Sequence, residues 1–230
     1  MIVYGRQPVR ELLRAKRRRV SKVWAVEGAA SEPWLEHVKV EIVRPFALTE
    51  MADSENHQGI CAETEGYPYV GAAELLLVSD ALIVALDEVQ DPQNLGAIAR
   101  TAEVAGATGL VIPERRSAEV TAAACKASAG AVEHLRIARV RNLADFLDDA
   151  KAAGLWSYGA DAAGVPYTSP DYSGGVVLVM GAEGKGLRPR VAKACDELIA
   201  LPVRGKIESL NVSAAASALL YGILQGKDPT

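Results

Sequence analysis

The sequence predicts an α/β fold in which helices cover both sides of a parallel sheet, preceded by a small α/β unit. Two unbroken apolar runs, ALIVAL at 81–86 and VVLVM at 176–180, are typical of strands that are buried on both faces. Strand-like and helix-like segments alternate around these runs, which indicates a parallel sheet between two helical layers. A segment rich in Gly, Pro and Tyr at 66–71 is typical of a linker, so we expect domains at 1–66 and 80–230 with a linker at 67–79.

The small unit begins with a predicted helix. Pro8 suits the first turn of a helix, and Val9, Leu12 and Leu13 repeat at helical spacing. The remaining expected elements are a strand at 20–28, a helix at 32–39, a strand at 40–44, a helix at 46–52, a strand at 58–63 and a short helix at 72–78.

The second part predicts six strands and five helices in alternation. The expected strands are 81–86, 109–112, 135–140, 155–159, 176–180 and 198–201. The expected helices are 94–105, 118–127, 143–153, 189–195 and 211–224. Because ligands of open parallel sheets bind beyond the carboxyl ends of the strands, the loops after these strands are the candidate sites.

Composition and charge exclude several classes of protein. Half of the 230 residues are apolar and 23% are charged, which excludes a disordered chain. No apolar run reaches the roughly 18 residues of a membrane span, and the first residues do not resemble a secretory signal. The cysteines contain no CxxC and the histidines show no metal-ligand spacing, so we expect a cytoplasmic protein without a metal.

The net charge of −4 argues against a protein that binds nucleic acid over its whole surface. The charge is uneven, however: residues 1–22 hold eight basic residues and one acidic residue, which gives 8 − 1 = +7. Arg6, Arg10 and Arg14 recur every four residues, which places them along one face of the first helix.

Three loops combine residues that could carry chemistry. DPQNLGAIART, after the strand at 81–86, contains Asn94 as a possible helix cap and Arg100. MGAEGKGL, after the strand at 176–180, surrounds Glu183 with three glycines, as a sharp bend or a close ligand would require. SLNVSAAA, before the last helix, offers Ser209 or Asn211 as a cap. None of these loops is a dinucleotide fingerprint or a Walker A motif.

Together, in this order and at this spacing, the three motifs resemble the SpoU/TrmH family of RNA ribose 2′-O-methyltransferases within the SPOUT class. VYGRQPVRELL and HQGICAE resemble the opening and closing segments of that family's small L30e-like substrate-binding domain. The resemblance implies a C-terminal trefoil knot, built from the loops at 181–187 and 202–210, and a homodimer. It is strongest to the subgroup that methylates a guanosine of bacterial 23S rRNA.

The resemblance also implies the site residues. The catalytic positions would be Asn94, Arg100, Glu183, Asn211 and Ser213. S-adenosylmethionine would be held by Gly181, Leu201 and Leu210, with Met180 and Ile199 nearby. Arg6, Arg10 and Arg14 would follow RNA phosphates. Glu208 is a departure in the cofactor loop, since relatives often have a small residue at its position, and Lys206 is not diagnostic of the family.

Several alternatives stay open on the sequence. Arg100 could be the base or a clamp for an RNA phosphate, and we favour the clamp because a guanidinium deprotonates only above a pKa of about 12. The RNA could be tRNA or another rRNA nucleotide instead of a 23S rRNA guanosine. A non-catalytic RNA-binding protein on the same scaffold is a rival from another class. A nucleotide-dependent metabolic enzyme is disfavoured by the missing glycine fingerprint.

Overall fold

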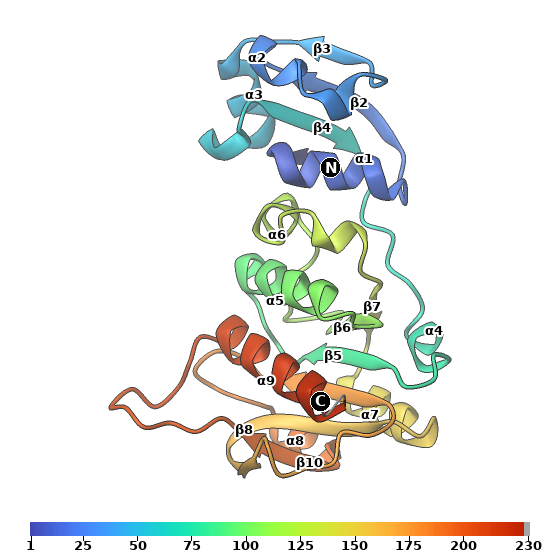
Figure 1. Ribbon diagram of the computed structural model, residues 1–230, viewed down its shortest axis with the longest axis vertical. Helices are drawn as coiled ribbons and strands as arrows, with labels where there is room; N and C mark the ends of the chain where they lie inside the picture. The colour runs from blue at the N-terminus through green and yellow to red at the C-terminus, as the bar shows by residue number, and fades with distance from the viewer. Residues whose placement is uncertain (228–230) are drawn as a thin grey trace.

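The protein forms two α/β units stacked along its long axis, each built on its own sheet (Figure 1). This computed structural model describes residues 1–227. The smaller sheet has the strand order β1-β4-β2-β3 and the larger one the order β10-β8-β9-β5-β6-β7. No helix within 1–227 is both long enough and apolar enough to cross a membrane.

The small sheet is mixed. β4 (Ile60–Thr64) pairs antiparallel with both β1 (Ile2–Tyr4) and β2 (Val20–Ala25), and β3 (Val40–Ile42) pairs parallel with β2. Its helices are α1 (Arg6–Ala15), α2 (Glu27–Ala30) and α3 (Pro45–Ala52), with single 3₁₀ turns at Pro33–Leu35 and Glu55–His57. Val9 and Leu12 of α1 enter the main core, whereas Leu48 of α3 packs with Trp24 and Cys61 in a separate cluster.

Two predictions for the small unit were wrong. The predicted helix at 32–39 is only a 3₁₀ turn at Pro33–Leu35: Pro33 sets its first position, and the chain enters β3 at Val40 soon after it. The predicted strand at 20–28 ends at Ala25, and α2 follows it. The strand β1 was missed, since three residues are too short to show a periodicity.

The large sheet is parallel at every strand pair, as predicted. Its strands are β5 (Leu82–Leu86), β6 (Gly109–Pro113), β7 (Ile137–Val140), β8 (Trp156–Pro166), β9 (Val176–Met180) and β10 (Glu197–Ala200). Every residue of β5 and β9 is buried, because helices cover both faces of the sheet. β8 runs well beyond its predicted end at 159 and pairs with β10 across a register shift.

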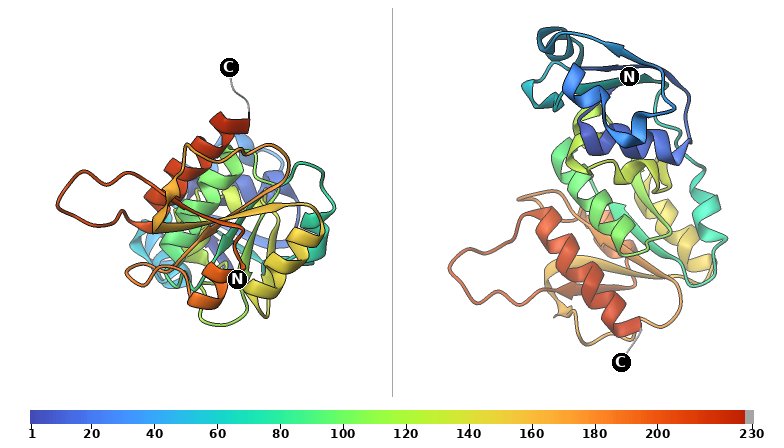
Figure 2. Two further views of the ribbon diagram at one scale, coloured as in Figure 1. Left: turned by 90° about the horizontal axis from the view of Figure 1, so that it is seen from below. Right: turned by 45° about the horizontal axis from the view of Figure 1, so that its top comes forward.

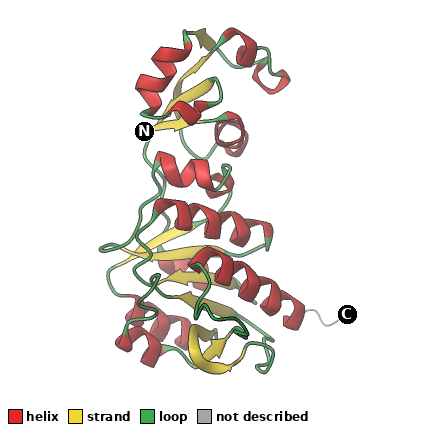
Figure 3. Ribbon diagram, turned by 90° about the vertical axis from the view of Figure 1, so that its left-hand side faces the viewer, coloured by secondary structure: helices red, strands yellow, loops and turns green. Residues whose placement is uncertain are grey.

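Helices form the two outer layers (Figures 1 and 3). α5 (Pro92–Val104), α6 (Ala122–Ala127) and α9 (Val212–Lys227) belong to the layer on one face, where Val84 and Leu178 of the sheet point. α4 (Ala72–Leu76), α7 (Leu143–Ala152) and α8 (Pro189–Ala194) cover the other face, over Ile83 and Val177. This alternation along β5 and β9 follows from the two-residue repeat of a strand.

The two units are joined by buried polar contacts. The guanidinium of Arg18 bonds to both carboxylate oxygens of Glu133, and both side chains are about 1% exposed. Arg17 Nη1 donates to Leu135 O at 2.7 Å, and Tyr67 Oη donates to the same oxygen at 2.6 Å. Two cations of the basic N-terminal run therefore hold the units together and are not free for an external anion.

The predicted domain division at 1–66, 67–79 and 80–230 stays a prediction, because the main core contains residues of both units. The trefoil knot also stays a prediction, because strand order does not test how the chain is threaded.

Candidate functional site

The candidate site lies at the carboxyl ends of β5 and β9. These neighbouring parallel strands end side by side, with Leu86 opposite Met180. The loop into α5 follows β5, and the glycine-rich loop follows β9. The third predicted loop, at 201–211, extends away from the body of the protein before α9 begins (Figures 1 and 2).

A chain of hydrogen bonds joins the three loops. Asn94 Nδ2 donates to Glu183 Oε2 at 3.3 Å, and Asn211 Nδ2 donates to Asn94 Oδ1 at 3.0 Å. Asn211 Oδ1 in turn accepts from Ser213 Oγ at 2.6 Å and from the Ser213 amide at 2.9 Å. Four of the five predicted catalytic residues therefore meet, although they are spread over 120 positions of the sequence.

The cap of α5 differs from the prediction. Asp91 is the N-cap, since its Oδ1 accepts from the Gln93 amide at 2.8 Å, and Asn94 lies inside the first turn. Because Asp91 caps the helix, the side-chain amide of the buried Asn94 forms its hydrogen bonds with the other two loops instead. At α9, Asn211 precedes the first helical residue and accepts from backbone amides, as predicted for a cap.

Arg100 does not join this cluster. It is exposed on α5, and within residues 1–227 it makes no hydrogen bond or ion pair with the other four residues. Six helical positions separate it from Asn94, so the two side chains leave different faces of α5. An exposed, unengaged guanidinium is available for a ligand outside the cluster.

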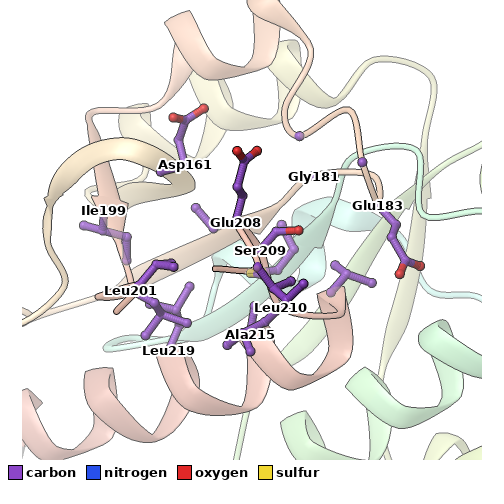
Figure 4. A pocket seen from close by; sticks show the side chains of 18 of the residues that line it. Asp161, Gly181, Glu183, Ile199, Leu201, Glu208, Ser209, Leu210, Ala215 and Leu219 are labelled. Carbon is purple, nitrogen blue, oxygen red and sulfur yellow. The ribbon is translucent and has the colours of Figure 1, made fainter. Parts of the chain in front are cut away.

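A pocket of about 670 Å³ adjoins the cluster. All five predicted cofactor positions line it: Met180, Gly181, Ile199, Leu201 and Leu210. Ala215 and Leu219 of α9 add apolar surface, and the carboxylates of Asp161 and Glu208 are also in the lining (Figure 4). Asp161 was missed by the sequence interpretation, because it lies in the part of β8 that was not predicted.

Gly181 is required by close backbone contact. A Cβ at this position would lie 2.2 Å from Gly186 C and 2.4 Å from Leu187 N. Two backbone hydrogen bonds close the bend of this loop: the Ala182 amide donates to Gly186 O at 3.1 Å, and the Gly186 amide donates to Ala182 O at 2.9 Å. The glycines of this loop therefore let it fold back on itself beside the pocket.

An ion pair missed by the sequence interpretation fixes the same loop. Asp87 is fully buried and accepts from Arg188 N at 2.8 Å and from Arg188 Nε at 2.7 Å. These hydrogen bonds raise the pKa of Arg188 above its ordinary value. Because Asp87 follows β5 and Arg188 follows the glycine-rich loop, the pair ties the loop to the sheet.

The arginines of α1 lie far from this cluster, on the small unit. All three are exposed, but Arg6 pairs with Glu32 at 2.6 Å and Arg14 pairs with Glu11 at 3.7 Å. Arg10 has no ion-pair partner among the described residues. Within 1–227, no group of three or more His, Cys, Asp or Glu side chains is arranged to hold a metal ion.

Comparison with known proteins identifies both units. Residues 81–221 match the model of the SpoU rRNA Methylase family, and residues 2–70 match the model described as RNA 2′-O ribose methyltransferase substrate binding. YacO of Bacillus subtilis (strain 168), provisionally named a TrmH family tRNA/rRNA methyltransferase, is 37% identical over 99% of this chain and 96% of its own length.

Two solved structures are similar over nearly the whole chain. The SpoU methyltransferase AviRb from Streptomyces viridochromogenes, in complex with the cofactor AdoMet, is 25% identical, with a TM-score of 0.83, over 98% of this chain and 89% of its own. The AdoMet-bound rRNA methyltransferase from Sinorhizobium meliloti is 29% identical, with a TM-score of 0.82, over 96% of this chain and 85% of its own.

The close contact at Gly181 predicts the effect of adding one methyl group. Gly181→Ala should lower the free energy of unfolding by at least about 2 kcal/mol, because its Cβ meets backbone atoms that cannot rotate away. Gly205→Ala is the matched control, since its Cβ would meet nothing closer than 4.0 Å. Urea unfolding of both variants checks this, and equal stabilities would contradict it.

Proposed function

The chain belongs to the SpoU rRNA methylase family, and we propose that it transfers the methyl group of S-adenosylmethionine to a ribose 2′-hydroxyl of RNA, with a guanosine of 23S rRNA as the favoured target. The observation that carries this proposal is the convergence of Asn94, Glu183 and Asn211 beside the pocket of about 670 Å³. This convergence is what a single reaction centre that draws on all three loops requires.

The pocket suits S-adenosylmethionine in size and chemistry. Its volume of about 670 Å³ lies within the range of small-molecule sites. Met180, Ile199 and Leu219 offer apolar contact to the adenine, while the carboxylates of Asp161 and Glu208 can accept hydrogen bonds from hydroxyl or ammonium groups. Glu208, a departure from the family pattern, would thus place a carboxylate beside a cationic ligand. When bound, the cofactor supplies an activated methyl group.

The chain's own residues position the nucleophile. Attack on a methyl group requires an in-line approach, so holding the ribose is the main demand. Arg100 would clamp the neighbouring RNA phosphate, which suits a planar, permanently charged donor. Asn94, Asn211 and Ser213 would fix the loops around the nucleotide. Of the five side chains, Glu183 alone offers a carboxylate, which makes it the candidate acceptor for the hydroxyl proton.

The small unit supports rRNA as the substrate. It matches a family model for substrate binding, and Arg10 of α1, beside the two paired arginines, has no ion-pair partner within residues 1–227. We propose that Arg6, Arg10 and Arg14 contact RNA phosphates, with Arg10 contributing most. A 2′-O-methyltransferase that acts on tRNA is the second candidate, since the relative from Bacillus subtilis is named for both RNAs.

We further propose a homodimer located in the cytoplasm, where rRNA is made and modified in bacteria. Val203, Ile207 and Leu210 of the loop at 201–211 are between 52% and 78% exposed, which suits a surface covered by a second copy. The contact would lie beside the cofactor pocket, because Leu210 also lines that pocket.

Mapping of ribose methylation tests the proposed function. Deproteinised 23S rRNA from cells that lack the protein should gain one 2′-O-methyl mark after incubation with the purified chain and S-adenosylmethionine. Parallel reactions with 16S rRNA and bulk tRNA separate the two candidate substrates. Binding of S-adenosylmethionine and RNA without any methyl transfer would refute the enzyme and favour a non-catalytic RNA-binding protein.

The exposed position of Arg100 predicts a selective loss. Arg100→Ala should lower the rate of methyl transfer by at least about 100-fold, since positioning of the ribose is lost. S-adenosylmethionine affinity should stay within about twofold, because Arg100 is outside the pocket lining. Tritium transfer and calorimetry measure the two effects, with the exposed Arg190→Ala as control. Near-normal turnover of Arg100→Ala would contradict the assignment.

A further inference from the structure

A second pocket, of about 370 Å³, lies at the seam between the two units. We refer to it as the seam pocket. Its lining is Tyr4, Asn56 and Gln58 from the small unit, Gln93 from α5, and Ala123, Lys126 and Ala127 from α6. None of these residues has a part in the function proposed above, and none belongs to the three motifs' catalytic or cofactor positions.

Lys126 is held in this pocket without an anionic partner. Its Nζ lies 5.9 Å from the centroid of the Tyr4 ring. It also lies 2.6 Å from the point that a Cβ of residue 5 would occupy, so Gly5, at φ +98°, leaves room for the ammonium. Among the described residues Lys126 forms no ion pair, and burial lowers its pKa. A partly desolvated cation with no counter-charge favours an anionic ligand.

The remaining polar groups of the seam pocket are side-chain amides. Gln58 Oε1 accepts from the Arg6 amide at 3.0 Å, which fixes the orientation of the side chain and leaves its NH₂ group free. Asn56 and Gln93 are exposed, and within residues 1–227 their side-chain amides have no hydrogen-bond partner. Amides both donate and accept, as the edges of nucleobases and ribose hydroxyls require.

The seam pocket is rigidly connected to the candidate reaction centre. Gln93 is the neighbour of Asn94 on α5. α5 and α6 are in close contact, since a Cβ at Gly96 would lie 2.6 Å from Ala124 O. Figure 3 shows α6, α5 and the start of α9 stacked below the small unit on one side of the molecule. An RNA strand that crosses from the small unit to the Asn94 cluster therefore passes the seam pocket.

We propose that the seam pocket is an RNA subsite, which holds a nucleotide adjacent to the methylated one, with its phosphate on Lys126 and its base or ribose against Gln58 and Gln93. This inference rests on RNA being the substrate, as proposed above. RNA is favoured over a protein segment because the lining offers a cation and amides but no large apolar side chain other than the partly covered Tyr4 ring.

Salt-dependent RNA binding tests the subsite. Lys126→Gln should bind transcribed 23S rRNA roughly fivefold to tenfold more weakly than the wild type, and the slope of log affinity against log salt should fall by about one. S-adenosylmethionine affinity should be unchanged. Lys193→Gln, an exposed change on α8 with the same loss of charge, is the control and should show neither effect. Lys126→Arg should restore most of the affinity.

A second variant guards against a folding defect in Lys126→Gln. Gln93 is exposed, so Gln93→Glu should leave the melting temperature at the wild-type value. The added carboxylate repels a phosphate bound at Lys126, so this variant should bind RNA more weakly. If both pocket variants bind RNA like Lys193→Gln, the subsite is refuted. RNA binding that depends on Lys126 without any methyl transfer by the wild type would instead refute the proposed methyltransferase function while supporting RNA binding at the seam pocket.

Discussion

The hydrogen bond between the Asn94 and Asn211 side chains is the interaction on which the candidate site depends. Asn94 is buried at the start of α5, and its amide has one acceptor and one donor engaged, by Asn211 and Glu183 respectively. Because an amide can serve both partners at once, one side chain fixes two loops relative to the sheet. Asn94 is the buried member of this group, whereas Asn211 and Glu183 are exposed, so loss of either bond leaves a polar group of Asn94 without its protein partner.

The contacts between the two units place the substrate-binding unit beside the candidate site. The buried Arg18–Glu133 pair and the Tyr67 hydroxyl join the small unit to the large one, and the seam pocket lies where the two units meet. Loss of one partner of such a buried pair typically costs about 3–5 kcal/mol. The overall negative charge of the chain is therefore compatible with RNA binding, since the proposed phosphate contacts need only a few cations, such as Arg10 and Lys126, at defined positions on the surface.

The sequence predicts the parallel sheet well, because β5 and β9 are unbroken apolar runs and strand-like and helix-like segments alternate around them. It fails at 32–39, where only a 3₁₀ turn at Pro33–Leu35 forms, and at β8, whose exposed half lacks apolar alternation. The motifs locate Asn94, Glu183 and Asn211, but hydrogen bonds between loops are not visible in spacing. For the same reason the Asp87–Arg188 pair and Lys126 could not be found: their roles depend on contacts between distant segments.

A double-mutant cycle on Asn94 and Asn211 tests most directly whether one hydrogen bond joins the loops into a reaction centre. The rate of methyl transfer to 23S rRNA is measured for Asn94→Ala, Asn211→Ala and the double variant. If the two amides act as a unit, the double variant should be no slower than the slower single variant, within about twofold. Multiplication of the two single effects would show that the residues act independently and would contradict this account.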